Sequence, residues 1–191
     1  MAYFVFAEFG SAVVVKFLTD LRQALQCRPD ASPIHVTLQG PYKSPPKLEQ
    51  LDRSAQLLRG LGVAIKGHGY FNTEKGFSVY VLAECAAFRD MWDKPDFRGP
   101  REDIKPHITL FESRDRDAAQ QVRDFLRREN ILIHTYNVHL SIYESRAAQA
   151  DFFSRPIATP IGKAISRDLY RIPEGMLDKA RELGSRLTQA M

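Results

Sequence analysis

The sequence predicts an α+β protein whose two lobes are built in the same way. Short apolar segments with strand character alternate with segments whose apolar residues fall at helical spacing. Two segments, 33–38 and 105–110, also carry matching short motifs, and each is followed by a helical pattern. At 191 residues, with 44% hydrophobic and 26% charged residues, the chain is long enough for one packed domain or for two small lobes that share a core.

The first half of the chain reads as strand, helix, strand, helix and two further strands. The apolar run 3–9 predicts a strand that ends at Gly10, and Ser11 is positioned to cap the next helix. Gly40-Pro41 ends a short second strand, and Pro45-Pro46 opens a second helix. The expected elements are strands over 3–9, 34–38, from 63 onward and over 77–83, and helices over 11–25 and 46–58.

The second half repeats this order and then adds an extension. A loop rich in proline, glycine and charge leads into the second motif strand, and the apolar run 131–143 predicts one long strand or a bent pair. Pro173 opens a last amphipathic helix. The expected elements are a helix over 86–92, a loop over 93–106, a strand over 107–111 and a helix over 115–128. We expect a bilobal domain over 1–144 and a C-terminal extension over 145–191.

Charge, cysteine content and hydropathy limit the classes of partner and compartment. The net charge of +4 and the pI of about 9.1 suit a partner that carries phosphates. Cys27 and Cys85 form neither a disulfide framework nor a zinc motif. The N-terminal segment lacks the basic leader of a signal peptide, and no apolar stretch reaches the length of a membrane span. We expect a cytoplasmic protein without a membrane partner, acting as a monomer.

The two motifs place a histidine and a threonine on one face of a strand. They read Pro33-Ile34-His35-Val36-Thr37-Leu38 and Lys105-Pro106-His107-Ile108-Thr109-Leu110. Because alternate residues of a strand point to the same face, His35 lies beside Thr37, and His107 beside Thr109. The aliphatic neighbours take the opposite face. If the two lobes are related by a pseudo-twofold axis, the two polar faces meet across one cleft.

This combination of groups suits the cleavage of a phosphodiester. A neutral imidazole can accept a proton from water or from a ribose hydroxyl, and a protonated imidazole opposite can give one to the leaving oxygen. The threonine hydroxyls can donate hydrogen bonds to the non-bridging phosphate oxygens. We therefore predict His35 and His107 as catalytic residues, and Thr37 and Thr109 as phosphate-binding residues.

Other candidate groups carry weaker signals. His68, His134 and His139 lack a threonine two positions later, and we interpret them as structural, with His68 in a glycine-rich loop. Tyr42 follows the first motif strand and is a possible substrate-lining residue that would stack on a base; a turn tyrosine is the alternative. The sequence has no cluster with metal-ligand spacing and no phosphate-binding glycine loop, so we expect no metal and no cofactor.

The paired His-x-Thr motifs, their spacing and the strand-helix lead-in resemble the two-histidine (2H) phosphoesterase superfamily, over roughly residues 1–144. Within it, the chain is similar to the bacterial RNA 2′,5′ ligase and 2′,3′-cyclic phosphodiesterase proteins. The resemblance implies two lobes with antiparallel sheets around a central cleft, catalysis without metal, and 2′,3′-cyclic or 2′,5′-linked nucleotide or RNA substrates. It also implies catalytic His35 and His107.

Two other functions are compatible with the same motifs. An RNA 2′,5′ ligase would run the reverse reaction at the same site. A nucleotide- or RNA-binding module would keep the fold with little turnover, although such a module has no need of two complete His-x-Thr pairs. Hydrolysis of cyclic nucleotides, ligation of RNA halves, or binding without turnover would distinguish the three.

Overall fold

The computed structural model describes residues 2–26, 32–58, 60–74, 76–94, 99–100, 103–145 and 168–189. It is a mixed α and β structure with two antiparallel sheets, which confirms the predicted α+β class. In the part of the chain that is described, no helix is both long and apolar enough to cross a membrane.

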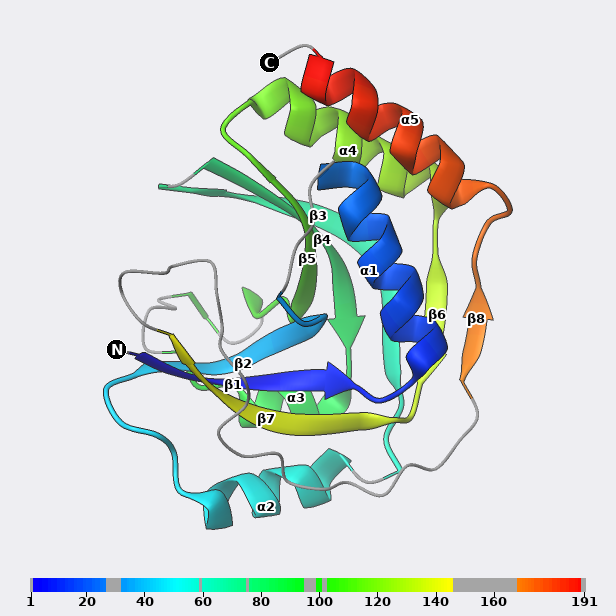
Figure 1. Ribbon diagram of the computed structural model, residues 1–191. Coiled ribbons are helices and arrows are strands. Elements are labelled where there is room, and N and C mark those ends of the chain that lie inside the picture. Colours follow the sequence, from blue (N-terminus) through cyan, green and yellow to red (C-terminus); the bar gives the residue numbers. More distant parts are fainter. Residues whose placement is uncertain are drawn as a thin grey trace.

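The first sheet has three strands in the order β2-β1-β7 and contains the first motif. Both outer strands pair antiparallel with β1, which lies in the centre. In Figure 1 these strands run across the middle of the molecule. Their bounds are Ala2–Phe9 for β1, His35–Tyr42 for β2 and Val138–Ser145 for β7.

The second sheet has five strands in the order β5-β4-β3-β6-β8 and contains the second motif in its edge strand β5. All of its neighbouring strands pair antiparallel. In Figure 1 β6, β8 and the lower parts of β3 and β4 run roughly upright, across the direction of the first sheet, and the upper parts of β3 and β4 bend away to the left. Their bounds are Val63–Thr73 for β3, Gly76–Glu84 for β4, His107–Ser113 for β5, Leu132–Thr135 for β6 and Leu169–Arg171 for β8.

The helices divide between the two sheets. The helices α2 and α3 contact strands of the first sheet, whereas α4 packs across β3, β4 and β5 of the second. The helix α1 follows β1 of the first sheet but packs against β5 and α5, and so it ties the two halves together (Figure 1). The bounds are Ala12–Gln26 for α1, Leu48–Leu58 for α2, Ala86–Met91 for α3, Arg116–Glu129 for α4 and Met176–Gln189 for α5.

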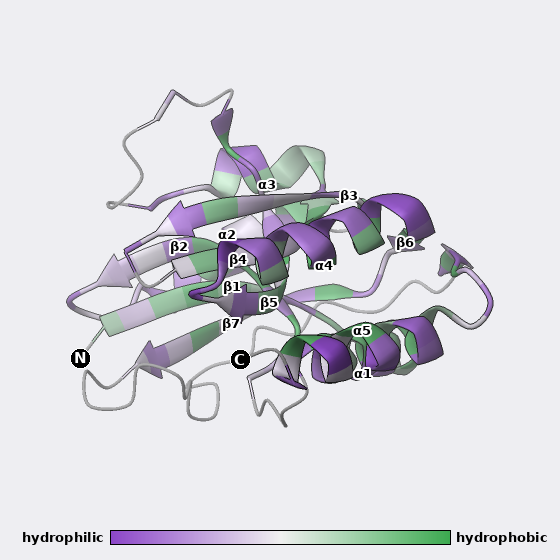
Figure 2. Ribbon diagram, turned by 90° about the horizontal axis from the view of Figure 1, so that it is seen from above, coloured by the Kyte–Doolittle hydropathy of each residue, from purple (hydrophilic) through white to green (hydrophobic). Residues whose placement is uncertain are grey.

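Helix α4 shows why these segments become covering helices. Asp115 caps its first turn, because its side chain accepts hydrogen bonds from the backbone amides of Asp117 and Ala118. Asn130 ends the helix in a left-handed conformation. Its outward side is strongly hydrophilic in Figure 2, while the opposite side is buried through Ala118, Ala119, Val122, Phe125 and Leu126.

The two motif strands carry matching β-bulges directly after their threonines. On the first sheet Phe6 of β1 pairs with Thr37, but the next residue, Val5, pairs with Gln39, so that Leu38 is the extra residue. On the second sheet Tyr80 of β4 pairs with Thr109, and Val79 pairs with Phe111, so that Leu110 is the extra residue. Leu38 and Leu110 are both fully buried. The internal repetition predicted from the motifs therefore extends to the pairing register.

The structure corrects one local prediction, adds one strand and resolves an alternative that the sequence left open. His68 lies inside the strand β3, next to a register irregularity between Lys66 and Gly69, rather than in a loop. The short strand β8 was not anticipated from the sequence. The predicted strand over 131–143 is two strands, β6 and β7, which belong to different sheets.

The predicted C-terminal extension contributes to the same core as the second sheet. Its helix α5 contacts α1 and α4, and Met176, Ala180 and Leu183 are buried there. Its strand β8 pairs with β6. Residues 146–167 of the extension lie outside the described residues.

Gly40, at the end of the first motif strand, provides a test of this packing. Its φ is +97°, and a Cβ atom added there would lie 2.4 Å from the backbone oxygen of Tyr3. Gly60 also has a positive φ, of +75°, but an added Cβ would meet nothing within 4 Å. We expect Gly60→Ala to lower the free energy of unfolding by about 1 kcal/mol. Gly40→Ala should cost more, about 2–3 kcal/mol.

Urea denaturation of both variants measures this difference. Equal losses of stability in Gly40→Ala and Gly60→Ala would contradict the close approach of β1 to Gly40, because only the backbone conformation would then matter.

Candidate active site

The cross-strand register places each motif residue opposite a defined partner. Thr37 pairs with Phe6 and His35 with Glu8 on the first sheet. Thr109 pairs with Tyr80 and His107 with Leu82 on the second sheet, and so each threonine stands opposite an aromatic residue. Directly paired residues share a sheet face. The predicted arrangement of a histidine and a threonine on one face is therefore present in both strands.

Each histidine is held by the same backbone hydrogen bond. The Nδ1 atom of His35 lies 2.8 Å from the carbonyl oxygen of Pro33, and that of His107 lies 2.7 Å from the carbonyl oxygen of Lys105. A carbonyl oxygen can only accept, so Nδ1 carries the hydrogen in both rings. The Nε2 atom is then the nitrogen of each ring that can accept a further proton.

The strands that carry the two imidazoles meet although they belong to different sheets. The strands β2 and β5 are in contact. The charged form of His107 disfavours that of His35, which lowers the pKa of His35 further. The two motif strands therefore lie side by side, with His107 close enough to act on the charged form of His35.

Burial against aromatic rings dominates the pKa of both histidines. The ring of Phe6 stacks on His35 at a centroid distance of 3.7 Å, and the rings of Tyr80 and Phe71 each lie 4.8 Å from His107. Burial lowers the pKa of His35 and of His107 to about 4, from an ordinary value of 6.5. The backbone hydrogen bond of each ring acts in the opposite direction and raises its pKa.

The threonines remain available for a ligand. Both are partly buried and lie on the same strand faces as the histidines. Within the described ranges, neither the Thr37 nor the Thr109 hydroxyl forms a hydrogen bond with another side chain. Each can therefore donate its proton to an oxygen of a bound anion.

Arg22 supports the first histidine from behind. It is one of the few buried charged residues, with 5% of its surface exposed. Its guanidinium donates to the carbonyl oxygens of Pro33, at 3.4 Å, and of Ser32. The Pro33 carbonyl thus accepts from both Arg22 and His35, which fixes the loop that orients this imidazole.

Sequence reasoning did not single out Arg22, Glu8, Phe6 or Tyr80. The strand pattern of β1 puts Phe6 and Glu8 on one face, but nothing in the sequence states which residue of β1 pairs with which residue of β2. Each bulge shifts the pairing of β1 with β2 by one position, so that this pairing can be read only from the fold.

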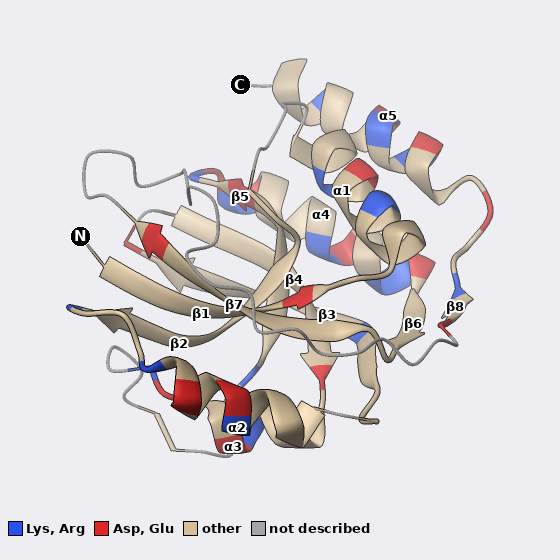
Figure 3. Cartoon of the chain, turned by 60° about the horizontal axis from the view of Figure 1, so that its bottom comes forward, with Lys and Arg blue, Asp and Glu red and all other residues tan. Residues whose placement is uncertain are grey.

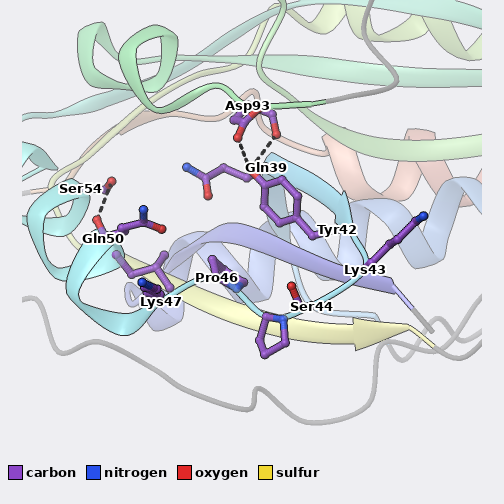
Figure 4. Close-up of a pocket in the computed structure, with 11 residues that line it drawn as sticks. Gln39, Tyr42, Lys43, Ser44, Pro46, Lys47, Gln50, Ser54 and Asp93 are labelled. Atoms are coloured by element: carbon purple, nitrogen blue, oxygen red, sulfur yellow. Dashed lines mark hydrogen bonds between the residues drawn. The ribbon is translucent and has the colours of Figure 1, made fainter.

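Tyr42 lies in a separate pocket. It pairs with Tyr3, on the face of β1 that also carries the buried Val5, and its hydroxyl donates to the carboxylate of Asp93 (Figure 4). A pocket of 610 Å³ is lined there by Gln39, Tyr42, Lys43, Ser44, Pro45, Pro46, Lys47, Gln50, Leu51, Ser54 and Asp93. The structure therefore brings Tyr42 together with two lysines, while neither histidine lines this pocket.

The remaining histidines occupy different places. His68 lies in β3 near Arg123 and Arg127, and burial together with these charges lowers its pKa. His134 lies in β6. His139 lies in β7 directly opposite Glu8, on the polar face of the first sheet. Of these three histidines, only His139 is linked to a motif: it lies opposite Glu8, and Glu8 lies opposite His35.

Two comparisons of the sequence with known proteins give no match. No protein-family model and no curated protein sequence matches this chain. In the parts of the chain that are described, no group of three or more His, Cys, Asp or Glu side chains is arranged to hold a metal ion.

The low pKa values predict that acid destabilises the fold. Between pH 6.5 and about 4 the unfolded chain binds protons at His35 and His107 that the folded protein does not bind. The free energy of unfolding must therefore fall as the pH falls through this window. We expect denaturant midpoints to be lower at pH 5 than at pH 7.5, and the difference to shrink in the variant His35→Gln/His107→Gln. An unchanged pH dependence in that variant would contradict the assignment of low pKa values to these two rings.

Proposed function

We propose that the protein is a phosphodiesterase of the two-histidine kind, in which His35 and His107 act as acid and base on one phosphate. The observation that carries this proposal is the repeated geometry of the motifs. Both have an imidazole with its Nδ1 bound to the carbonyl two residues earlier. Both place a threonine on the same face. The contact between the motif strands β2 and β5 supports a single site.

The chemistry follows from these groups. An attacking water or hydroxyl forms a new bond to phosphorus and gives its proton to one neutral Nε2. The other Nε2, whose pKa of about 4 in the protein without ligand rises beside the bound phosphate anion, gives its proton to the leaving oxygen as the old bond to phosphorus breaks. The hydroxyls of Thr37 and Thr109 donate to the non-bridging oxygens, whose charge must be stabilised in the transition state. These residues supply both proton transfers themselves, so the proposed mechanism runs without a metal ion.

The proposed substrates are 2′,3′-cyclic phosphates and 2′,5′-linked nucleotides or RNA ends. This choice is supported by the resemblance of the paired motifs to the 2H phosphoesterases, and by the basic charge of the chain. A cyclic mononucleotide is the simplest test, because opening of its ring yields one monoester and needs no second substrate.

Loss of either imidazole should abolish most of the turnover. We expect His35→Ala and His107→Ala each to reduce kcat for a 2′,3′-cyclic nucleotide by roughly 10²–10⁴-fold, since each removes one proton-transfer group. Thr37→Ala and Thr109→Ala should cost less, because one hydrogen bond to phosphate is lost. His134→Ala, a histidine in β6 outside both motifs, is the matched control. A His107→Ala variant as active as the parent would contradict the acid–base assignment. Circular dichroism of the parent and of each variant checks that all of them are folded.

The proposed mechanism also predicts resistance to chelators. We expect the rate of cyclic-nucleotide hydrolysis to be unchanged after dialysis against EDTA, because no step needs a metal ion. Loss of the activity in EDTA with recovery on adding a divalent cation would count against the two-imidazole mechanism.

A further inference from the structure

The two half-sites match in backbone geometry but differ in the residue opposite the histidine. At the position paired with His35 the first sheet carries Glu8, and at the position paired with His107 the second sheet carries Leu82. The strands β1 and β2 carry few charged residues (Figure 3), and Glu8 is the single acidic residue in either strand. The repeated framework therefore holds one carboxylate on one side only.

Glu8 is fixed in place by neighbours on β7. The Tyr143 hydroxyl donates to its Oε1 at 2.8 Å, and Nε2 of His139 lies 3.6 Å from its Oε2. Its side chain is only 12% exposed. Burial alone would raise the pKa of Glu8, but the neighbouring His139 and the hydrogen bond from Tyr143 hold that pKa below its usual value. The carboxylate is therefore ionised at neutral pH and points to a defined position.

The charged groups around the two histidines differ, because only His35 has an acidic neighbour that raises its pKa. The charged or titratable neighbours of His35 are Glu8 on β1, Arg22 on α1 and His107 on β5. On β7, His139 and Tyr143 contact Glu8. After burial and its backbone hydrogen bond, the largest influence on His35 is Glu8, which raises its pKa and outweighs Arg22. The charged neighbour of His107 is Lys94, which lowers its pKa.

We propose that Glu8 is a positioning residue that makes the half-sites unequal, so that His35 carries the proton given to the leaving oxygen and His107 accepts the proton of the attacking hydroxyl. This inference rests on the proposed phosphodiesterase function. In the step, an oxygen–phosphorus bond forms as its proton moves to Nε2 of His107. The bond to the leaving oxygen breaks as that oxygen takes the proton from Nε2 of His35. Exchange with solvent restores both rings.

The pH profile of Glu8→Gln tests this inference. Activity falls at high pH when the acid loses its proton, and at low pH when the base gains one. Removing the carboxylate makes the charged form of His35 less favourable, so we expect the basic limb of the kcat/KM profile to move down by about 1 pH unit. The acidic limb should stay in place, and Glu8→Asp should restore much of the shift. Movement of the acidic limb alone, or of neither limb, would overturn the proposal.

Glu84→Gln is the matched control. Glu84 is a strand carboxylate that pairs with Lys66 at 2.9 Å, and its loss should move neither limb. A purely structural role of Glu8 would lower activity at every pH and would leave both limbs in place.

A second measurement keeps failure of this inference separate from failure of the proposed function. Proton NMR titration of the full chain follows the two imidazoles whether or not any substrate is turned over. We expect the midpoint of His35 to fall in Glu8→Gln but not in Glu84→Gln, and the midpoint of His107 to stay in place in both variants. An unchanged His35 midpoint would overturn the role of Glu8 even if the enzyme hydrolyses cyclic nucleotides. The expected shift without any turnover would instead reject the phosphodiesterase.

Discussion

The hydrogen bond from each imidazole Nδ1 to the carbonyl two residues earlier is the constraint on which the site depends. It fixes the tautomer, leaves Nε2 as the nitrogen that can accept a further proton, and opposes the effect of burial on the pKa. The carbonyl can hold its position because the residues that follow enter a sheet at once. At His35 it is held a second time by the buried guanidinium of Arg22. A ring that rotated freely about χ1 and χ2 would lose entropy in every encounter with a substrate, whereas these rings have lost it on folding.

The repeated framework and its unequal surroundings have different physical origins. The bulges after Thr37 and Thr109 are backbone features, and in both motifs the extra residue is a buried leucine, Leu38 or Leu110. The electrostatic difference comes from one position of the neighbouring strand, where either an acidic or an aliphatic residue fits the half-exposed face. Two half-sites with the same backbone geometry can thus differ in the charge beside their histidines through a single cross-strand residue.

Much of the fold was predictable because it depends on local patterns. The strand and helix periods, the capping residues and the His-x-Thr spacing all act within a few residues, and they placed the motif strands correctly. The glycines around His68 were misleading, because they permit a strand irregularity as well as a loop. The division of 131–143 into strands of different sheets depends on distant partners, Val63 for one and Phe9 for the other. Glu8 was not predicted for the same reason, since only the register of β1 on β2 brings it opposite His35.

The central claim is that both motifs act on one phosphate. The most direct measurement is an NMR titration of the full chain with a nucleoside 2′-monophosphate, the product of the proposed reaction, which reports on the two imidazoles separately. A phosphate between them favours the charged form of each ring, so the signals of His35 and His107 should shift along one binding curve with a single Kd. A shift confined to one histidine, or two curves with different affinities, would contradict the claim.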